Sequence, residues 1–238
     1  MFLKELTEYF RGQDRRSVTI LLSSVVLMVI YLYQGNHNFF LSHFGSEFAD
    51  RNQALTFGQV YQCTVAFLLW AVIPIILIKF FIGDDLKDYG ICLGDWRFGL
   101  KFFLLSIPIL LPVLYLTSLN PEFPAEYPLS PLAARGTSGF VLWELTYLIY
   151  YLGFEFIFRG YMQLGLLKRL GPFLAIMAQT IPSTIVHWGK PEGETISAIV
   201  AGLAFGALAI RTRSILWGLM VHYFVGIATD FFCLLQRI

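Results

Sequence analysis

Long apolar runs separated by polar loops dominate this chain and restrict what it can fold into. Hydrophobic residues make up 57% of its 238 residues and charged residues only 14%, whereas soluble domains carry roughly a quarter charged residues. A helix needs roughly 20 apolar residues to cross a hydrocarbon layer about 30 Å thick. Such runs occur at 17–34, 60–82, 99–119, 139–169, 172–188, 194–210 and 214–235. We therefore expect an all-α, polytopic membrane bundle of about seven transmembrane helices.

The fourth run, residues 139–169, is longer than one simple crossing requires. Two interpretations stay open for it. Either one tilted helix spans the membrane, or a break near Gly153 or Gly160 divides the run.

The basic residues predict the orientation in the membrane. With the N-terminus in the cytoplasm, 13 of the 17 Lys and Arg residues lie on the cytoplasmic half, which agrees with the positive-inside rule. These are Lys4, Arg11, Arg15, Arg16, Lys79, Lys87, Arg97, Lys101, Arg159, Lys168, Arg169, Arg211 and Arg213. The remaining four are Arg51, Arg135, Lys190 and Arg237.

Composition excludes several classes of partner and site. The net charge is +1 and no basic run is present, so we expect contact with membrane lipids and none with nucleic acid. The three cysteines, Cys63, Cys92 and Cys233, lack CxxC spacing and are expected to be packing residues. His37 and His43 stand alone in a loop and are expected to be solvated. No internal repeat is evident, so we treat residues 1–238 as one membrane domain.

Ionisable residues inside spans are costly in hydrocarbon and usually mark function. All of those found here follow residue 139, so residues 1–138 are interpreted as scaffold helices and loops. They are Glu144, Glu155, Arg159, His187, Glu194, His222 and Asp230.

Helical spacing groups several of these side chains. Glu155 and Arg159 are separated by four residues, share a helix face and are able to form an ion pair, which by itself has a purely structural explanation. Glu144 lies three turns before Glu155 on nearly the same face, together with Tyr151.

The depth of each side chain follows from its distance to the nearest turn. Glu155 and His187 lie 16 residues before and after Gly171, or roughly 24 Å from it in an antiparallel pair. His222 lies nine residues after Arg213, about 13 Å by the same rule. The difference in depth between His222 and the other two side chains becomes smaller if Lys168 and the adjacent Arg169 project beyond the bilayer surface. One Glu, one Arg and two His are then expected to meet in a cavity open to the cytoplasm.

Such a group has two chemical interpretations. A carboxylate and a histidine activate water while a second histidine stabilises an oxyanion, which suffices for hydrolysis of an amide. Alternatively, Glu155, His187 and His222 are a ligand set for a divalent metal such as zinc. The absence of an HExxH motif makes the metal hypothesis the weaker one, and no cofactor is firmly predicted.

Three stretches in order, "FEFIFRGYMQ", "STIVHWGKP" and "AGLAFGALAIRTRSILWGLMVHYFVG", resemble the CPBP family (CAAX protease and bacteriocin-processing). This family of intramembrane proteases includes the type II CAAX prenyl endopeptidases. The resemblance covers residues 139–235 and implies that they form the catalytic core. It implies a helical bundle in the bacterial inner membrane that cleaves a membrane-anchored or lipidated protein substrate.

Motif positions transfer residue by residue. Glu155 matches the second Glu of EExxxR, Arg159 and Gly160 match the following RG, and His187 and His222 match the histidines of the second and last motifs. In the family a glutamate and a histidine activate water.

Three positions depart from the family pattern. Phe154 stands where the first Glu belongs, Ser183 replaces the Phe of FxxxH, and Gly226 replaces the last-motif Asn or Asp. Glu194 and Asp230 are the expected replacements. A looser pattern in the family, with an aromatic residue before a single Glu and KPxxE after the histidine, resembles this chain and implies Glu155 as the base.

Three functions therefore remain open. The first is an intramembrane endopeptidase with Glu155, Arg159, His187, His222 and Glu194 as catalytic residues, supported by Glu144, Tyr151 and Asp230. The second is a catalytically silent relative that binds a peptide or prenyl chain in secretion, sorting or immunity. A small transporter is disfavoured because the first three spans are poor in charged residues.

Overall fold

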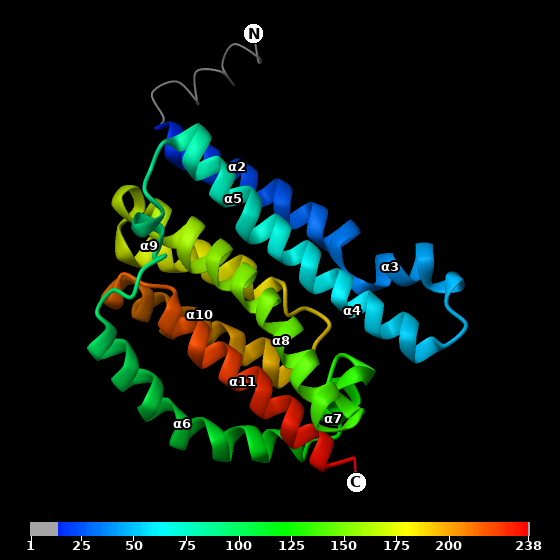
Figure 1. The fold of residues 1–238 in the computed structure, drawn as a ribbon. Helices are drawn as coiled ribbons and strands as arrows, with labels where there is room; N and C mark the ends of the chain where they lie inside the picture. The colour runs from blue at the N-terminus through cyan, green and yellow to red at the C-terminus, as the bar shows by residue number, and fades with distance from the viewer. Residues whose placement is uncertain (1–13, 238) are drawn as a thin grey trace.

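The computed structural model describes residues 14–237, and within that range every regular element is helical (Figure 1). The principal α-helices are α2 (Arg15–Ile30), α3 (His37–Phe44), α4 (Arg51–Phe67), α5 (Ile73–Ile76), α6 (Trp96–Ser118), α7 (Glu122–Glu126), α8 (Gly136–Glu155), α9 (Gly165–Ile185), α10 (Glu192–Thr212) and α11 (Leu216–Leu235). Three π-helical stretches extend the long helices, at η1 (Tyr31–Gly35), η3 (Leu68–Val72) and η4 (Leu77–Ile82), and a fourth, η7 (Phe156–Leu164), joins α8 to α9. Short 3₁₀ turns are η2 (Gly45–Glu47), η5 (Leu86–Tyr89) and η6 (Pro131–Ala134).

Six helical stretches of the described chain are long and apolar enough to cross a membrane. They are Arg15–Gly35, Arg51–Ile82, Trp96–Ser118, Gly136–Ile185, Glu192–Thr212 and Leu216–Leu235. The expectation of an all-α polytopic bundle is confirmed, and the chain is an integral membrane protein.

The expected count of about seven differs from six at one place, the long stretch Gly136–Ile185. It contains both the fourth and the fifth expected spans, and the chain changes direction inside it at Gly171, whose φ of 74° and ψ of 169° are not helical. Glycine adopts positive φ without a steric penalty, and Pro172 follows it as the start of the second arm. The sequence therefore located both arms and their junction.

Neither Gly153 nor Gly160 breaks the helix, so of the two interpretations of the fourth run the undivided helix is correct. The helix instead widens to a π-helix from Phe156 to Leu164. A Cβ at Gly153 would lie 3.0 Å from the carbonyl oxygen of Ala66, and one at Gly160 would lie 2.8 Å from that of Tyr89. Both glycines thus allow close approach of a neighbouring backbone.

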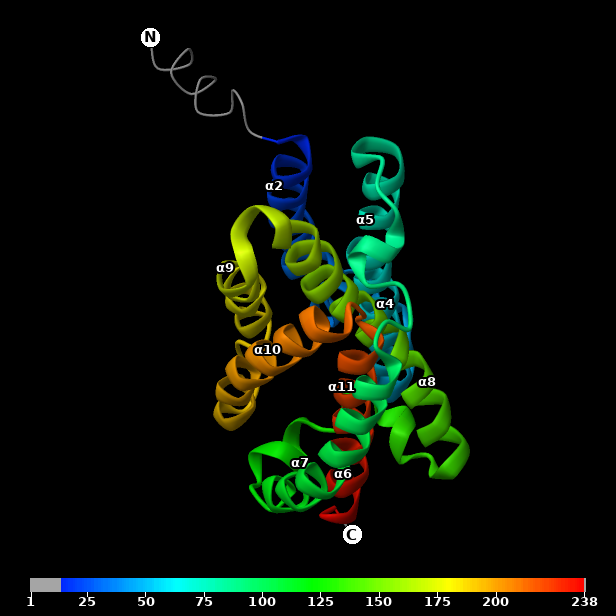
Figure 2. The ribbon, with the colours of Figure 1, turned by 90° about the vertical axis from the view of Figure 1, so that its left-hand side faces the viewer.

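The helices pack around α8 and η7, which lie in the middle of the bundle (Figures 1 and 2). The α4–α5 stretch runs beside α2 on one side, and α9, α10 and α11 cover the other. Helix α6 packs on α11 at the outside of the bundle and is curved, with Pro108 and Pro112 in its interior. Its outward apolar surface therefore faces lipid.

Both polar loops contain short helices. Residues 37–44 form helix α3, and its histidines contact local partners, His37 Nδ1 at 3.2 Å from Gln62 Oε1 and His43 Nδ1 at 3.0 Å from Ser42 Oγ. The proline-rich segment 119–139 contains α7 and η6.

The three cysteines are free thiols. Cys63 and Cys233 are buried as expected of packing residues, whereas Cys92 is half-buried.

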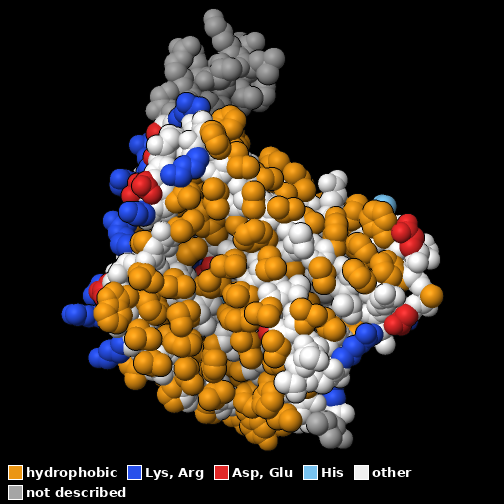
Figure 3. All heavy atoms as spheres, in the orientation of Figure 1, with side chains coloured by type: hydrophobic (Ala, Val, Ile, Leu, Met, Phe, Trp, Pro, Cys, Tyr) orange, Lys and Arg blue, Asp and Glu red, His pale blue; other side chains and the backbone are white. Residues whose placement is uncertain are grey.

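Basic side chains gather along one edge of the molecule (Figure 3). Ion pairs connect the segments at this end, which we call the basic end: Arg16 with Asp84, Arg169 with Asp14 at 3.9 Å, and Arg211 with Asp95 at 2.7 Å. Lys4 and Arg11 lie outside the described residues. Arg159 is the exception among the residues counted for this end, because it is buried in the bundle.

Candidate active site

The carboxylate of Glu155 is the centre of a buried polar cluster in the bundle. Glu155, the last residue of α8, is fully buried. Its Oε1 lies 2.7 Å from Nδ1 of His222 and 3.4 Å from Nη1 of Arg159. The predicted ion pair is therefore present, and it is joined by the last-motif histidine.

The depth of His222 is explained by the turn between α10 and α11. A Cβ at Gly90 would lie 2.9 Å from Leu164 and 3.0 Å from Ile215, so these two residues are level with each other. Glu155 precedes Leu164 by nine residues and His222 follows Ile215 by seven, which brings both to a similar depth.

Phe154 packs against every member of the cluster except the carboxylate itself. The guanidinium of Arg159 lies 5.4 Å from the Phe154 ring centroid and 5.6 Å from that of Phe205. The Phe154 ring also meets the rings of His187 and His222 edge-on, with centroids 5.8 and 5.1 Å apart. The aromatic replacement for an acid thus holds the arginine through its ring face.

The hydroxyl of Tyr151 occupies the space where a side chain at position 226 would begin. A Cβ at Gly226 would lie 2.3 Å from Tyr151 Oη. The Tyr151 ring also meets the His222 ring with centroids 4.7 Å apart. Gly226 lacks the polar side chain of the last motif. The Tyr151 hydroxyl from α8 lies at that place, and Asp230 does not.

His187 lies just beyond the end of α9 and is fixed by its backbone. Its Nδ1 lies 2.8 Å from the Ser183 carbonyl oxygen, and since a carbonyl only accepts, Nδ1 donates. In the neutral ring Nε2 is then an acceptor. The Ser183 that replaces a family aromatic therefore contributes its backbone, which any residue supplies.

Glu194 turns inward and bonds a residue that the sequence did not single out. Tyr127 donates its hydroxyl to Glu194 Oε1 at 2.7 Å. Burial, followed by the nearby Glu194 carboxylate, raises the pKa of Tyr127 well above its usual range, so the hydroxyl keeps its proton. Oε2 of Glu194 has no hydrogen-bond partner among the described residues. Nothing in the sequence signals Tyr127, because it comes from the proline-rich loop.

The polar contacts beside His187 lie on the side of the cluster that is opposite to the basic end. Lys190 pairs with Glu126, and Arg237 donates to the carbonyl of Pro124 at 2.9 Å, both in the segment that also carries Tyr127. If the basic end lies in the cytoplasm, as the sequence predicts, this flank of the cluster lies toward the opposite side of the membrane.

Glu144 and Asp230 form a second buried acidic pair, separate from Glu155. Asp230 is fully buried and accepts a hydrogen bond from Trp143 Nε1 at 2.7 Å. Asp230 lies beside Glu144, and both carboxyl oxygens of Glu144 and Oδ1 of Asp230 lack a hydrogen-bond partner among the described residues. Two adjacent buried carboxylates repel each other, so at least one of the two is expected to be protonated. The bond from Trp143 to Asp230 joins α8 to α11.

The ligands of the metal alternative are not grouped in the structure. Among residues 14–237, no group of three or more His, Cys, Asp or Glu side chains is arranged to hold a metal ion. His222 Nδ1 bonds Glu155 and His187 Nδ1 bonds the Ser183 carbonyl, which leaves Nε2 of each ring without either bond. Because Glu155, His187 and His222 are not arranged as a ligand set, no step below uses a metal.

One family model matches part of the chain. Residues 136–228 match the model of the family described as Type II CAAX prenyl endopeptidase Rce1-like. The CPBP resemblance is confirmed. No curated protein and no solved structure matches the chain. The Rce1-like segment contains Tyr151, Glu155, Arg159, His187 and His222, and it ends before Asp230.

Proposed function

We propose that this protein is an intramembrane endopeptidase that hydrolyses a peptide bond in a membrane-anchored, lipidated protein. The observation that carries the proposal is the 2.7 Å contact between Glu155 Oε1 and His222 Nδ1 in a buried, family-matched position. The family name suggests a prenylated substrate.

The contact determines which atom of His222 is free to act. A carboxylate only accepts, so Nδ1 of His222 donates to Glu155 and the neutral ring presents Nε2 as a base. Nε2 takes a proton from water as the oxygen attacks the scissile carbonyl, and the charge of Glu155 stabilises the imidazolium that forms. The same proton then passes to the leaving amine as the C–N bond breaks. Glu155 thus acts by orienting the His222 ring and by stabilising its positive charge.

Two donors are available for the oxyanion. The Tyr151 hydroxyl stands beside His222, and Nε of Arg159 has no hydrogen-bond partner among the described residues. A donor placed where negative charge develops is worth about 10²–10³-fold in rate. His187 packs against Phe154 at the edge of the same cluster, and its Nε2 is free. We assign His187 to orient the water, with Glu194 as a supporting acid.

Amide and alanine substitutions test the mechanism in purified protein reconstituted in lipid nanodiscs. Turnover of a fluorogenic farnesylated peptide is measured for Glu155→Gln and His222→Ala, with the unprenylated peptide as a second substrate. General-base catalysis contributes about 10²–10⁴-fold, so each variant is expected to lose at least about 100-fold in kcat. His43→Ala is the matched control, because His43 lies on the exposed helix α3.

The result is interpretable only when the variants remain folded, which thermal unfolding in detergent establishes. Wild-type turnover that survives both substitutions would exclude the Glu155–His222 mechanism.

A silent, peptide- or prenyl-binding relative is the second candidate, favoured by Phe154 in place of the first Glu and by the full burial of Glu155. It predicts that the farnesylated peptide binds without turnover and that Glu155→Gln leaves its Kd unchanged. Cleavage that depends on Glu155 would rule it out.

A further inference from the structure

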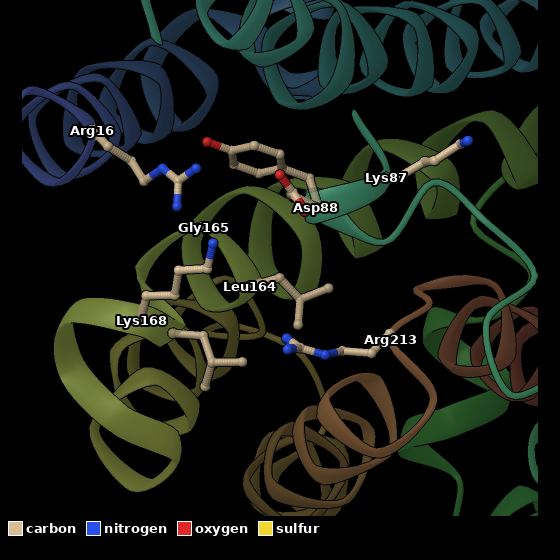
Figure 4. A pocket seen from close by; sticks show the side chains of 9 residues that line it. Arg16, Lys87, Asp88, Leu164, Gly165, Lys168 and Arg213 are labelled. Carbon is tan, nitrogen blue, oxygen red and sulfur yellow. The ribbon is translucent and has the colours of Figure 1, made fainter. Parts of the chain in front are cut away.

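A cavity of about 190 Å³ at the basic end lies well away from the Glu155 cluster. It is enclosed by four segments that are distant in sequence: the start of α2, η5, the η7–α9 junction and the α10–α11 turn (Figure 4). One water occupies about 30 Å³ in the liquid, so the cavity has room for a larger group.

Three basic side chains point toward one another in this cavity. Figure 4 shows Arg16 of α2, Lys168 of α9 and Arg213 of the α10–α11 turn converging, whereas Lys87 lies on the rim and extends away. Arg16 is paired with Asp84. Lys168 and Arg213 have no ion pair among residues 14–237, in contrast to Arg169 and Arg211 at the same end. Asp88 is the one acidic residue in the lining, so the cavity carries an excess of positive charge.

The positive-inside rule explains why basic residues are at this end but not why they converge. Like charges repel each other by Coulomb's law, so their convergence on one hollow is favourable when an anion lies between them. The backbone that carries Arg213 has a defined conformation. Arg213 has the one positive φ (58°) of a non-glycine residue in the described chain, and its carbonyl accepts from Cys92 Sγ at 3.0 Å.

Close packing makes the floor of the cavity rigid. A Cβ at Gly165 would lie 2.7 Å from both Ile20 and Tyr89, so α2, η5 and the start of α9 are in close contact there. Leu164 and Leu167 give the wall an apolar side next to the basic groups. The cavity lies where the membrane-spanning helices end, and it has basic groups next to an apolar wall. This combination fits a lipid headgroup with its attached glycerol better than a free anion.

We propose that this cavity binds the phosphodiester headgroup of an anionic phospholipid. Arg16, Lys168 and Arg213 contact the phosphate oxygens, and the glycerol end lies against Leu164 and Leu167. Basic pockets between helices on the cytoplasmic side are a general means of holding such headgroups. The proposal does not depend on peptidase activity.

Lipid titration of purified full-length protein in a neutral detergent, read by native mass spectrometry, tests the proposal. Phosphatidylglycerol is the ligand and phosphatidylcholine the neutral comparison. One basic side chain near the headgroup is worth about fivefold in affinity, so the double variant Lys168→Gln/Arg213→Gln is expected to weaken phosphatidylglycerol binding about 25-fold. Phosphatidylcholine binding is expected to stay unchanged.

Two controls separate a site from general surface charge. Arg97→Gln/Lys101→Gln removes the same number of charges from exposed positions of α6 that do not line the cavity, and Lys87→Gln removes the rim residue that points away. Both are expected to change phosphatidylglycerol affinity less than threefold. An equal loss in the Arg97/Lys101 variant, or equal binding of the two lipids, would overturn the proposal.

Inorganic phosphate and glycerol 3-phosphate serve as competitors that distinguish the source of the phosphate group. Neither is expected to displace phosphatidylglycerol at tenfold excess. Displacement by inorganic phosphate at equimolar concentration would assign the cavity to a free anion and overturn the lipid proposal.

Discussion

The ring of Phe154 lies 5.4 Å from the guanidinium carbon of Arg159, while the carboxylate of the next residue, Glu155, lies 3.4 Å from the same side chain. Phe154 and Glu155 thus both contact the buried guanidinium of Arg159, the first through its ring face and the second through its negative charge. In the family pattern both positions are acids. Here the first acid is replaced by a ring that needs no proton and no hydrogen bond in the membrane interior.

Phe154→Leu is predicted to destabilise the protein because the cation–π contact and the two edge-on histidine contacts are lost together. Such contacts contribute about 0.5–2 kcal/mol each, so a fall of about 1–3 kcal/mol in unfolding free energy is expected. Thermal unfolding in detergent measures it. Phe173→Leu, on a side chain that is 71% exposed, is the control and is expected to have little effect. An effect of equal size at both positions would contradict the packing role.

Gly226→Ala is predicted to be destabilising, because its Cβ would lie 2.3 Å from the Tyr151 hydroxyl. Overpacking of this kind costs about 1–3 kcal/mol. Tyr151→Phe removes the oxygen, so the double variant is expected to recover part of the loss, and a double-mutant cycle of unfolding free energies measures the coupling. Gly193→Ala, with nothing within 4 Å of its Cβ, is the control. Strictly additive effects would show that the two positions do not meet.

Glu144→Gln is predicted to be tolerated, within about 0.5 kcal/mol, because an amide keeps the shape of the side chain and places no second charge beside the buried Asp230. Glu144→Ala leaves a cavity beside Asp230, which is expected to cost about 2–4 kcal/mol. Chemical or thermal unfolding of both variants checks the difference. Equal destabilisation by Gln and Ala would show that the cost does not come from the cavity.

Metal chelation is predicted to leave turnover unchanged, because Glu155, His187 and His222 are not arranged as a ligand set. The measurement is the rate of peptide cleavage by purified protein before and after prolonged treatment with 1,10-phenanthroline. The non-chelating 1,7-isomer controls for direct inhibition. Loss of activity with 1,10-phenanthroline alone, restored by added zinc, would contradict this prediction.

Much of the fold was readable from local pattern. Apolar runs of sufficient length predicted every span, and Gly171 followed by Pro172 predicted the turn between two of them. The i,i+4 spacing predicted the Glu155–Arg159 pair, and residue counting from Gly171 predicted that His187 reaches the same level. These features depend on neighbours in the chain or on the thickness of the bilayer.

The sequence by itself determined that the protein crosses the membrane and that Glu155, Arg159, His187 and His222 are its candidate polar residues. Only the tertiary structure decided that Tyr151, and not Asp230, fills the space beside Gly226, and that Tyr127 bonds Glu194. It also decided that basic side chains from two helices and the α10–α11 turn converge on one cavity. The physical reason is that hydrophobicity sets which segments enter the bilayer, whereas the rotation and level of each helix follow from side-chain packing and hydrogen bonds between segments.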